Sequence, residues 1–285
     1  MTDSARRIDA HHHVWDLAVR DQPWTAPLPA LRRTFTIGDL RPHLTAHHIA
    51  ATVVVQTITV PEETPELLAL AAAEPVVAGV VGWVDLTAKE IADELARLRA
   101  LPGGHALVGV RHQVQEEPDP RWLCRAEVRR GLAAVAAAGL TYDVVVTPYQ
   151  LAATVETVQA VPELMFVLDH GGKPGIRSGE LEPWRGHIAA LGRCANATAK
   201  LSGLVTEAEH GTWTRADLRP YAATLLSSFG PARLMFGSDW PVCLLAAPYN
   251  RVVEAAEELT AQLSSTERAD VFGGTATRSY GLGRR

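Results

Sequence analysis

The chain has 285 residues, of which 47% are hydrophobic and 21% are charged, and its formal net charge is -5. This profile is typical of a globular protein with a substantial core. It argues against a basic nucleic-acid-binding surface, a long charged tail or a membrane-spanning segment. The cysteines have no disulfide-scaffold spacing, and histidines stand where a secretory signal would need apolar residues, so we expect a cytoplasmic protein.

The first expected strand ends in a run of three histidines. Residues 8–15 read Ile-Asp-Ala-His-His-His-Val-Trp, and side chains alternate between the two faces of an extended chain. His11 and His13 therefore point the same way, with Cα atoms roughly 6.5 to 7 Å apart, so both imidazoles can reach one metal ion, water or carbonyl oxygen. The apolar flanking residues argue against an expression tag, which usually lies among Gly and Ser.

The segment that follows is polar and rich in proline and aromatic residues, including Trp24. Residues 16–36 are too many for an ordinary tight connection, so we expect an inserted active-site loop. Beyond it, apolar runs of strand length alternate with helical patterns. We expect strands at 51–56, 76–84, 107–110, 142–146, 164–168, 197–202 and 233–237, and helices at 39–44, 65–73, 88–100, 126–138, 151–160, 187–193, 217–228, 250–263 and 265–272.

Eight strands that alternate with helices over this length predict an α/β fold, a single (β/α)8 TIM barrel. No shift in composition marks a second domain, so we expect residues 1–285 to form one. An open doubly wound sheet is the alternative. That fold usually has a glycine-rich turn after the first strand, where this chain has histidines.

In such a barrel the active site lies at the carboxyl ends of the strands. Polar side chains follow nearly every expected strand, more often than independent chance would deliver. They are His11 and His13 on the first, Gln56 on the second, Trp83 on the third, Arg111 and His112 on the fourth, His170 on the sixth, Ser202 on the seventh and Asp239 on the eighth.

Five of these segments carry a family resemblance: DAHHHVW, GVRHQ, LDHGGKP, KLSGL and FGSDWPV. They resemble the amidohydrolase superfamily (amidohydrolase 2 type), in particular its lactonase branch. The likeness is closest to L-fuconolactone and L-rhamnonolactone hydrolases, with 2-pyrone-4,6-dicarboxylate lactonase in the same branch. It spans residues 8–280 and implies a (β/α)8 fold with a site made from His11, His13, His170 and Asp239.

The resemblance leaves the metal content open. Many superfamily members hold two metals through a carbamylated lysine or an extra histidine, and the fifth strand here supplies neither. His11, His13, His170 and Asp239 could hold a single divalent ion, with Zn²⁺ the first choice. The same four side chains could instead polarise a carbonyl group with no metal present.

The activity implied is hydrolysis of a small lactone, such as a sugar aldonolactone. This reaction needs a nucleophilic water, a stabilised oxyanion and a proton for the departing alkoxide. We expect Asp239 to be the general base, and His11, His13 and His170 to polarise the carbonyl with or without a metal. A helix cap before Pro241 is the alternative role for Asp239.

A further set of side chains is expected to meet the substrate: Arg111, His112, Gln56, Lys173, Trp83 and Trp24. Arg111 offers a planar fork suited to carboxylate or carbonyl oxygens, and a salt bridge at the barrel rim is its alternative. Lys173 lies in a glycine-containing loop and has a solvated side chain as its alternative. For His112 the alternative is a hydrogen-bonded structural role.

Two other functions remain open from the sequence. One is a metal-dependent decarboxylase of a small aromatic or unsaturated acid, which would use a similar barrel. The other is a barrel that binds a ligand without turnover, although none of the four core residues is replaced by an inert side chain. The only partner that we expect is a small-molecule lactone, and the sequence indicates no oligomeric state.

Overall fold

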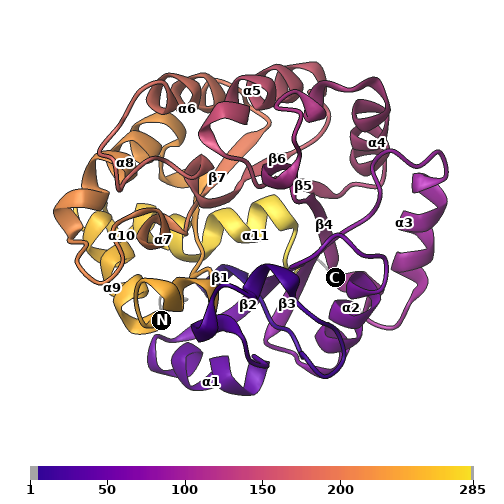
Figure 1. The fold of residues 1–285 in the computed structure, drawn as a ribbon, viewed down its shortest axis with the longest axis horizontal. Helices are drawn as coiled ribbons and strands as arrows, with labels where there is room; N and C mark the ends of the chain where they lie inside the picture. Colours follow the sequence, from indigo (N-terminus) through magenta and orange to yellow (C-terminus); the bar gives the residue numbers. More distant parts are fainter. Residues whose placement is uncertain (1–5, 284–285) are drawn as a thin grey trace.

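The computed structural model describes residues 6–283. Its eight parallel strands form one sheet in chain order, rolled into a ring (Figure 1). This arrangement confirms the predicted (β/α)8 TIM barrel. The strands are β1 Arg7–His12, β2 Ile49–Val55, β3 Val77–Gly82, β4 Leu107–His112, β5 Thr141–Val144, β6 Phe166–Leu168, β7 Ala197–Leu201 and β8 Leu234–Phe236.

Helices surround the ring and alternate with the strands. Among residues 6–283, none of them combines the length and the apolar character that crossing a bilayer would require. The last expected helix, 265–272, is in fact broken, because a π turn at Asp270–Gly274 separates α10 from α11. The helices are α1 Ile37–Ala46, α2 Glu63–Ala73, α3 Ile91–Ala100, α4 Ala126–Ala137, α5 Leu151–Ala160, α6 Trp184–Gly192, α7 Leu204–Glu207, α8 Arg215–Phe229, α9 Tyr249–Leu259, α10 Ser265–Ala269 and α11 Thr275–Tyr280.

Apolar side chains fill the barrel, and α11 closes one of its ends. In Figure 1 this helix lies across the middle of the ring. Leu282, just after α11, packs near the starts of β3 and β4 beside Gly79 and Val108. Helix α11, the plug helix, therefore covers the end of the barrel opposite to the carboxyl ends of the strands. The buried cluster that α11 completes consists of Ile8, Ala10, Ala51, Val53, Val55, Val81, Val108, Val167, Met235, Ala276, Tyr280 and Leu282.

Backbone hydrogen bonds close the ring between β1 and the residues after β8. The N–H of His13 donates to the carbonyl oxygen of Trp240 over 2.7 Å, and the N–H of Asp239 donates to that of His11 over 2.8 Å. The closure of the barrel therefore places two of the expected site histidines directly beside the expected base.

The buried carboxylate of Asp9 holds the same seam together. One oxygen accepts from the N–H of Ser238 at 2.8 Å, and the other accepts from the hydroxyl of Tyr249 at 3.1 Å. Burial raises the pKa of Asp9 to about 6, against the opposing effect of these hydrogen bonds.

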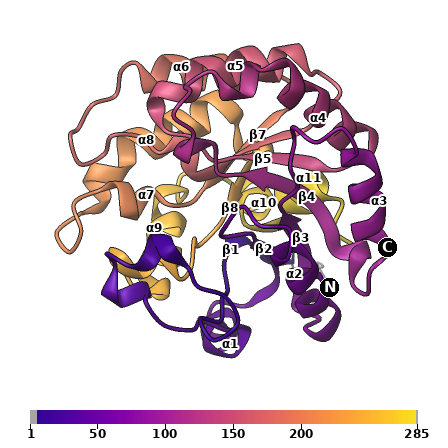
Figure 2. The same cartoon turned by 45° about the vertical axis from the view of Figure 1, so that its right-hand side comes forward.

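Residues 16–36 form a loop whose ends are pinned together. Trp15 and Phe35 exchange backbone hydrogen bonds of 3.0 and 2.9 Å across its base. The loop contains two short 3₁₀ turns, Pro23–Thr25 and Pro29–Leu31. Figure 2 shows this indigo segment beside the orange segment that follows β8, which carries Asp239.

Candidate active site

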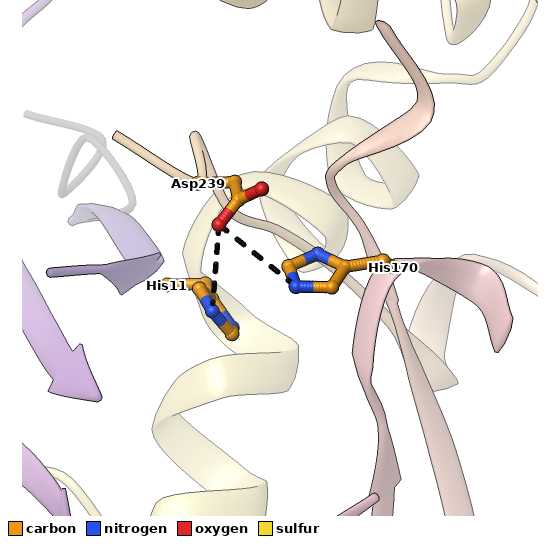
Figure 3. Close-up of side chains that lie close together, drawn as sticks. All are labelled: His11, His170 and Asp239. Carbon is orange, nitrogen blue, oxygen red and sulfur yellow. Dashed lines mark ion pairs between the residues drawn. The ribbon is translucent and has the colours of Figure 1, made fainter. Parts of the chain in front are cut away.

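The four expected core residues meet at the carboxyl end of the barrel. Oδ1 of Asp239 lies 3.7 Å from Nε2 of His11, 3.5 Å from Nε2 of His13 and 3.8 Å from Nε2 of His170. Figure 3 shows the carboxylate facing the rings of His11 and His170. The Nε2 atoms of His11 and His13 are 3.2 Å apart. All four side chains are buried, so one carboxylate oxygen faces three imidazoles at a site largely shielded from bulk solvent.

A second contact fixes each imidazole through its other nitrogen. Nδ1 of His13 lies 2.7 Å from the carbonyl oxygen of Val55. Nδ1 of His170 lies 3.0 Å from the hydroxyl of Ser202. Nδ1 of His11 faces the ammonium of Lys200 at 3.0 Å, as described below. Such outer contacts orient a histidine, and here they leave all three Nε2 atoms directed at Asp239.

The donor atoms fit one divalent metal ion. In a tetrahedral zinc site with bonds near 2.0–2.1 Å, ligand atoms lie roughly 3.3 Å apart. His11, His170 and Asp239 offer ligand atoms that all lie within 4.8 Å of one another. His13 adjoins two of these three at 3.2 and 3.5 Å. Three of the four expected donors therefore form a group that could hold a metal ion, and His13 lies beside it.

The backbone at the site adopts a conformation that is uncommon outside glycine. His170, Lys173 and Asp239 have φ values of +53°, +50° and +57°. Such left-handed residues cost about 1–3 kcal/mol each and gather where the surrounding structure imposes a functional geometry. The turns after β6 and β8 therefore aim His170 and Asp239 inward.

Two glycines make room for the histidines. A Cβ atom on Gly203 would lie 2.7 Å from the ring of His170, and one on Gly237 would lie 2.6 Å from Cβ of His11. Either contact would displace an imidazole, so these glycines of the KLSGL and FGSDWPV segments are required for close approach.

A cluster of buried charges lies directly beneath His11. Nζ of Lys200, in β7, is 2.6 Å from Oδ2 of Asp143 in β5 and 2.9 Å from Oδ1 of Asp169, which follows β6. All three side chains are fully buried. Tyr280 donates from the plug helix to Asp143 over 2.7 Å. Sequence reasoning missed this cluster, although a lysine in ATAKL and an aspartate in TYDV interrupt otherwise apolar strands.

The electrostatics give the site one ionised base beside two neutral rings, those of His11 and His170. Burial lowers the pKa of His170 to about 4. Burial and the neighbouring Lys200 hold the pKa of His11 well below its usual range. Burial alone would raise the pKa of Asp239, but His170, His13 and His11 outweigh it and keep that pKa low. At neutral pH, Asp239 is therefore a carboxylate, and His11 and His170 are neutral.

A cavity of about 200 Å³ opens above these residues. Among the expected substrate contacts, Arg111, Lys173 and Trp24 line it. Gln113, Gln115 and Glu116 line it too, although none was selected from the sequence, where Gln113 stands at the end of the GVRHQ segment. The lining consists of His13, Trp24, Thr57, Arg111, Gln113, Gln115, Glu116, Val145, His170, Lys173, Asp239 and Val242.

The positive charge of Arg111 is largely compensated by the carboxylate of Asp169 beneath it. Its Nη1 donates to Asp169 over 2.9 Å, and its Nε donates to the side chain of Gln56 over 3.0 Å. Its Nη2 donates to the backbone carbonyl of Gln56 over 2.5 Å. Gln56 is fully buried and is not part of the cavity lining. Its observed role is to orient the guanidinium.

Trp83 and His112 pair with each other away from the cavity. The indole N–H of Trp83 donates to Nδ1 of His112 over 3.0 Å, and Nε2 of His112 lies 2.8 Å from Glu117. The imidazole also stacks on Trp122, with centroids 4.3 Å apart. The structure does not bring either side chain to the lining, because both are engaged by neighbours at the rim.

Comparison with known proteins gives consistent matches over the whole chain. Residues 8–282 match the family model described as Amidohydrolase. The L-fucono-1,5-lactonase of Burkholderia multivorans is 40% identical over 290 residues, covering 98% of this chain and 97% of that protein. The L-fucono-1,5-lactonase of Burkholderia ambifaria is 37% identical over 284 residues, covering 98% and 96%.

Solved structures agree. A crystal structure of an amidohydrolase from Burkholderia multivorans with bound Zn superposes with a TM-score of 0.91 at 39% identity, covering 98% of this chain and all of that one (100%). The 5-carboxyvanillate decarboxylase of Sphingomonas paucimobilis gives a TM-score of 0.67 at 15% identity, covering 98% and 100%. This second likeness shows a shared fold alone.

A stability prediction concerns His12, on the other face of β1. Its Nε2 lies 2.9 Å from the hydroxyl of Thr52, and burial lowers its pKa to about 3. An unfolded histidine binds a proton near pH 6.5, so the unfolded state gains about 1.4 kcal/mol per pH unit as the pH falls from there towards the folded pKa. His12→Gln removes this contribution. In urea titrations, the difference in unfolding free energy between the wild type and His12→Gln should shrink by about 1.4 kcal/mol for each pH unit below about pH 6.5.

Thr52→Val is the matched control, because it removes the hydroxyl contact but keeps the histidine. It should retain the pH dependence of the wild type. If the difference in unfolding free energy between the wild type and His12→Gln stays constant from about pH 7.5 to about pH 5, the prediction is contradicted.

Proposed function

Because the chain belongs to the amidohydrolase family, we propose that it hydrolyses a small sugar-acid lactone of the L-fucono-1,5-lactone kind. One observation carries the proposal. The ionised carboxylate of Asp239 faces the Nε2 atoms of three buried imidazoles at 3.5–3.8 Å, beneath a polar cavity. The full-length likeness to two L-fucono-1,5-lactonases supports the choice of reaction.

Asp239 acts twice in the proposed mechanism. Its carboxylate accepts a proton from water as the water oxygen bonds to the lactone carbonyl carbon, and the carbonyl electron pair moves onto oxygen. The Nε2 atoms of His11, His13 and His170 lie around the developing oxyanion, and those that carry a proton donate to it. When the tetrahedral intermediate collapses, the bond from carbon to the ring oxygen breaks. Protonated Asp239 then donates to that oxygen, which gives the open-chain hydroxy acid.

His11, His13, His170 and Asp239 are the residues that would hold a divalent ion, and Zn²⁺ is our first choice. A bound ion would supply Lewis acidity for the carbonyl and lower the pKa of a bound water. The outer contacts made by Val55 and Ser202 support this proposal, because they hold His13 and His170 in ligating orientations.

The charges around the cavity favour a neutral, hydroxylated ring. The guanidinium of Arg111 is compensated by Asp169 at 2.9 Å, and the ammonium of Lys173 lies 3.9 Å from Glu207. Glu116 adds a carboxylate, and Gln113 and Gln115 add amides. No cation of this lining is left without an acidic neighbour to receive a substrate carboxylate. A dicarboxylate lactone or the substrate of a decarboxylase would meet a poorly matched surface.

The state of the cysteines bears on where the reaction takes place. Cys124, Cys194 and Cys243 are all free thiols. Free thiols are typical of proteins in reducing compartments. These cysteines support our proposal that the enzyme acts in the cytoplasm.

A substrate panel tests the proposed reaction. We expect a pH-indicator assay to show proton release with L-fucono-1,5-lactone and related aldonolactones. We expect kcat/KM for 2-pyrone-4,6-dicarboxylate to be lower by at least about 100-fold, because its charges would be unpaired in the cavity. Carbon dioxide release from an aromatic acid, with no turnover of lactones, would overturn the proposal.

Replacement of the base gives a second test. Asp239→Asn keeps the shape of the side chain but cannot accept the proton of water, so kcat should fall by about 10²- to 10⁴-fold. The circular dichroism spectrum should be unchanged. The exposed Glu163→Gln provides a control for loss of one carboxylate. An Asp239→Asn enzyme with near-normal kcat would remove this residue from the mechanism.

Metal analysis gives a third test. We expect about one Zn²⁺ per chain after dialysis against zinc, because the donor atoms suit a single ion. His170→Gln should lower this occupancy, whereas the exposed His105→Gln should not. Equal zinc content in the wild type and His170→Gln would show that any bound zinc lies elsewhere.

A further inference from the structure

The partners of Lys200 restrict where the proton of His11 can be. The side chain of Lys200 is fully buried, and an ammonium group only donates hydrogen bonds. It donates to Oδ2 of Asp143 at 2.6 Å, pairs with Oδ1 of Asp169 at 2.9 Å and faces Nδ1 of His11 at 3.0 Å. A neutral imidazole that accepts at Nδ1 carries its proton on Nε2.

A second contact independently assigns the same tautomer. The carbonyl oxygen of Val55 only accepts, so at 2.7 Å it requires a proton on Nδ1 of His13. When Nδ1 holds the only ring proton of His13, its Nε2 atom is an acceptor. That atom lies 3.2 Å from Nε2 of His11, which is then the donor.

Two neighbours favour the opposite assignment. One is Asp169, whose Oδ1 lies 3.3 Å from Nδ1 of His11, and the other is Arg111. Its Nη1 lies 3.4 Å from Nε2 of His11, near the limit for a hydrogen bond, and the same nitrogen already donates to Asp169 at 2.9 Å. The two shorter contacts, to Lys200 and His13, decide the tautomer.

We propose that Lys200 is a positioning residue that holds His11 in the Nε2–H tautomer when no metal is bound. In this state the Nε2–H group of His11 points towards the carboxylate of Asp239. It can donate to a developing oxyanion but cannot ligate a metal through Nε2. The catalytic consequence rests on the proposed function, whereas the tautomer itself does not.

Asp169 provides the alternative state. Its Oδ1 lies 3.3 Å from Nδ1 of His11. This buried oxygen accepts no hydrogen bond from any residue in the described part of the chain, although Lys200 lies 2.9 Å away. If a metal ion takes the lone pair of Nε2, the ring proton moves from Nε2 to Nδ1 by exchange and is donated to Asp169. The ring keeps one proton throughout.

Lys200 and Asp169 thus compete for one nitrogen of His11. The lysine favours the imidazole as a hydrogen-bond donor, and the aspartate favours it as a metal ligand. Lys200 therefore weakens metal binding by His11 and keeps a metal-free mode of carbonyl polarisation accessible.

The wild-type protein itself permits the first test. In two-bond ¹H–¹⁵N correlation spectra of chelator-treated enzyme, we expect a pyrrole-type Nε2 and a pyridine-type Nδ1 for His11, identified by their loss in His11→Gln. A pyrrole-type Nδ1 would overturn the proposal. This spectrum requires no substrate, so its outcome is separate from that of the lactone panel.

Lys200→Met supplies the second test. Without the ammonium donor, the spectrum of the variant should show the Nδ1–H tautomer, and its affinity for Zn²⁺ should rise by about 10- to 100-fold, the range for groups that orient a ligating histidine. A folded variant that keeps the wild-type tautomer, or binds zinc no more tightly, would overturn the proposal. If Lys200→Met does not fold, the wild-type spectrum still decides.

Tyr280→Phe is the matched control. It removes the 2.7 Å hydrogen bond to Asp143 but leaves the contact between Lys200 and His11 in place. Its tautomer and zinc affinity should equal those of the wild type. A change in either would assign the effect to loosening of the buried cluster and would contradict a specific role for Lys200.

Discussion

The closure of the barrel is the constraint on which the site depends. Two backbone hydrogen bonds, from His13 to Trp240 and from Asp239 to His11, join residues that are more than 200 positions apart in the sequence. These bonds fix the base against two histidines before any side chain is considered. Because the backbone at Asp239 is left-handed there, the turn after β8 aims the carboxylate across the mouth of the barrel and not outward.

Beneath this seam, the barrel buries a charge cluster in which every member has an opposite partner. Lys200 and Arg111 are the cations, and Asp143 and Asp169 are the carboxylates. Removal of one partner from such a cluster costs about 3–5 kcal/mol, because a charge is then left unpaired away from water. The cluster stabilises the fold only as a whole. The cluster also holds fixed charges directly behind His11, where water does not screen them.

The sequence was sufficient to predict most of the fold, for a physical reason. Strands of a parallel barrel are buried on both faces and read as apolar runs, so β2 and β4 were readily recognised. The rule that sites lie at carboxyl ends then brought His11, His170 and Asp239 to one edge. The rule cannot tell which strand-end side chains reach the cavity. That depends on neighbours, as with Trp83, which turns towards His112.

Other features could not be predicted because they arise from contacts between strands. Gln56 supports Arg111 only because β2 and β4 face a common interior. The buried pair of Lys200 and Asp143 was visible as two charges within apolar runs, but their proximity depends on β5 and β7 lying on either side of β6 in the closed sheet. The expected helix at 265–272 ends early at the π turn of Asp270–Gly274, and α11 beyond it was not expected because Gly273 and Gly274 read as the end of the helical pattern. Roles in catalysis stay proposals that geometry supports.

The plug helix α11 has a consequence for how the protein is made. Tyr280 reaches Asp143 from the last helix, and the seam needs residues just beyond β8. A ribosome adds roughly 5–20 residues per second, so the histidines of β1 leave the exit tunnel many seconds before their partners exist. The nascent chain therefore carries an unfinished barrel until α11 has been synthesised. A chain that terminates before α11 would leave the amino-terminal end of the barrel uncovered.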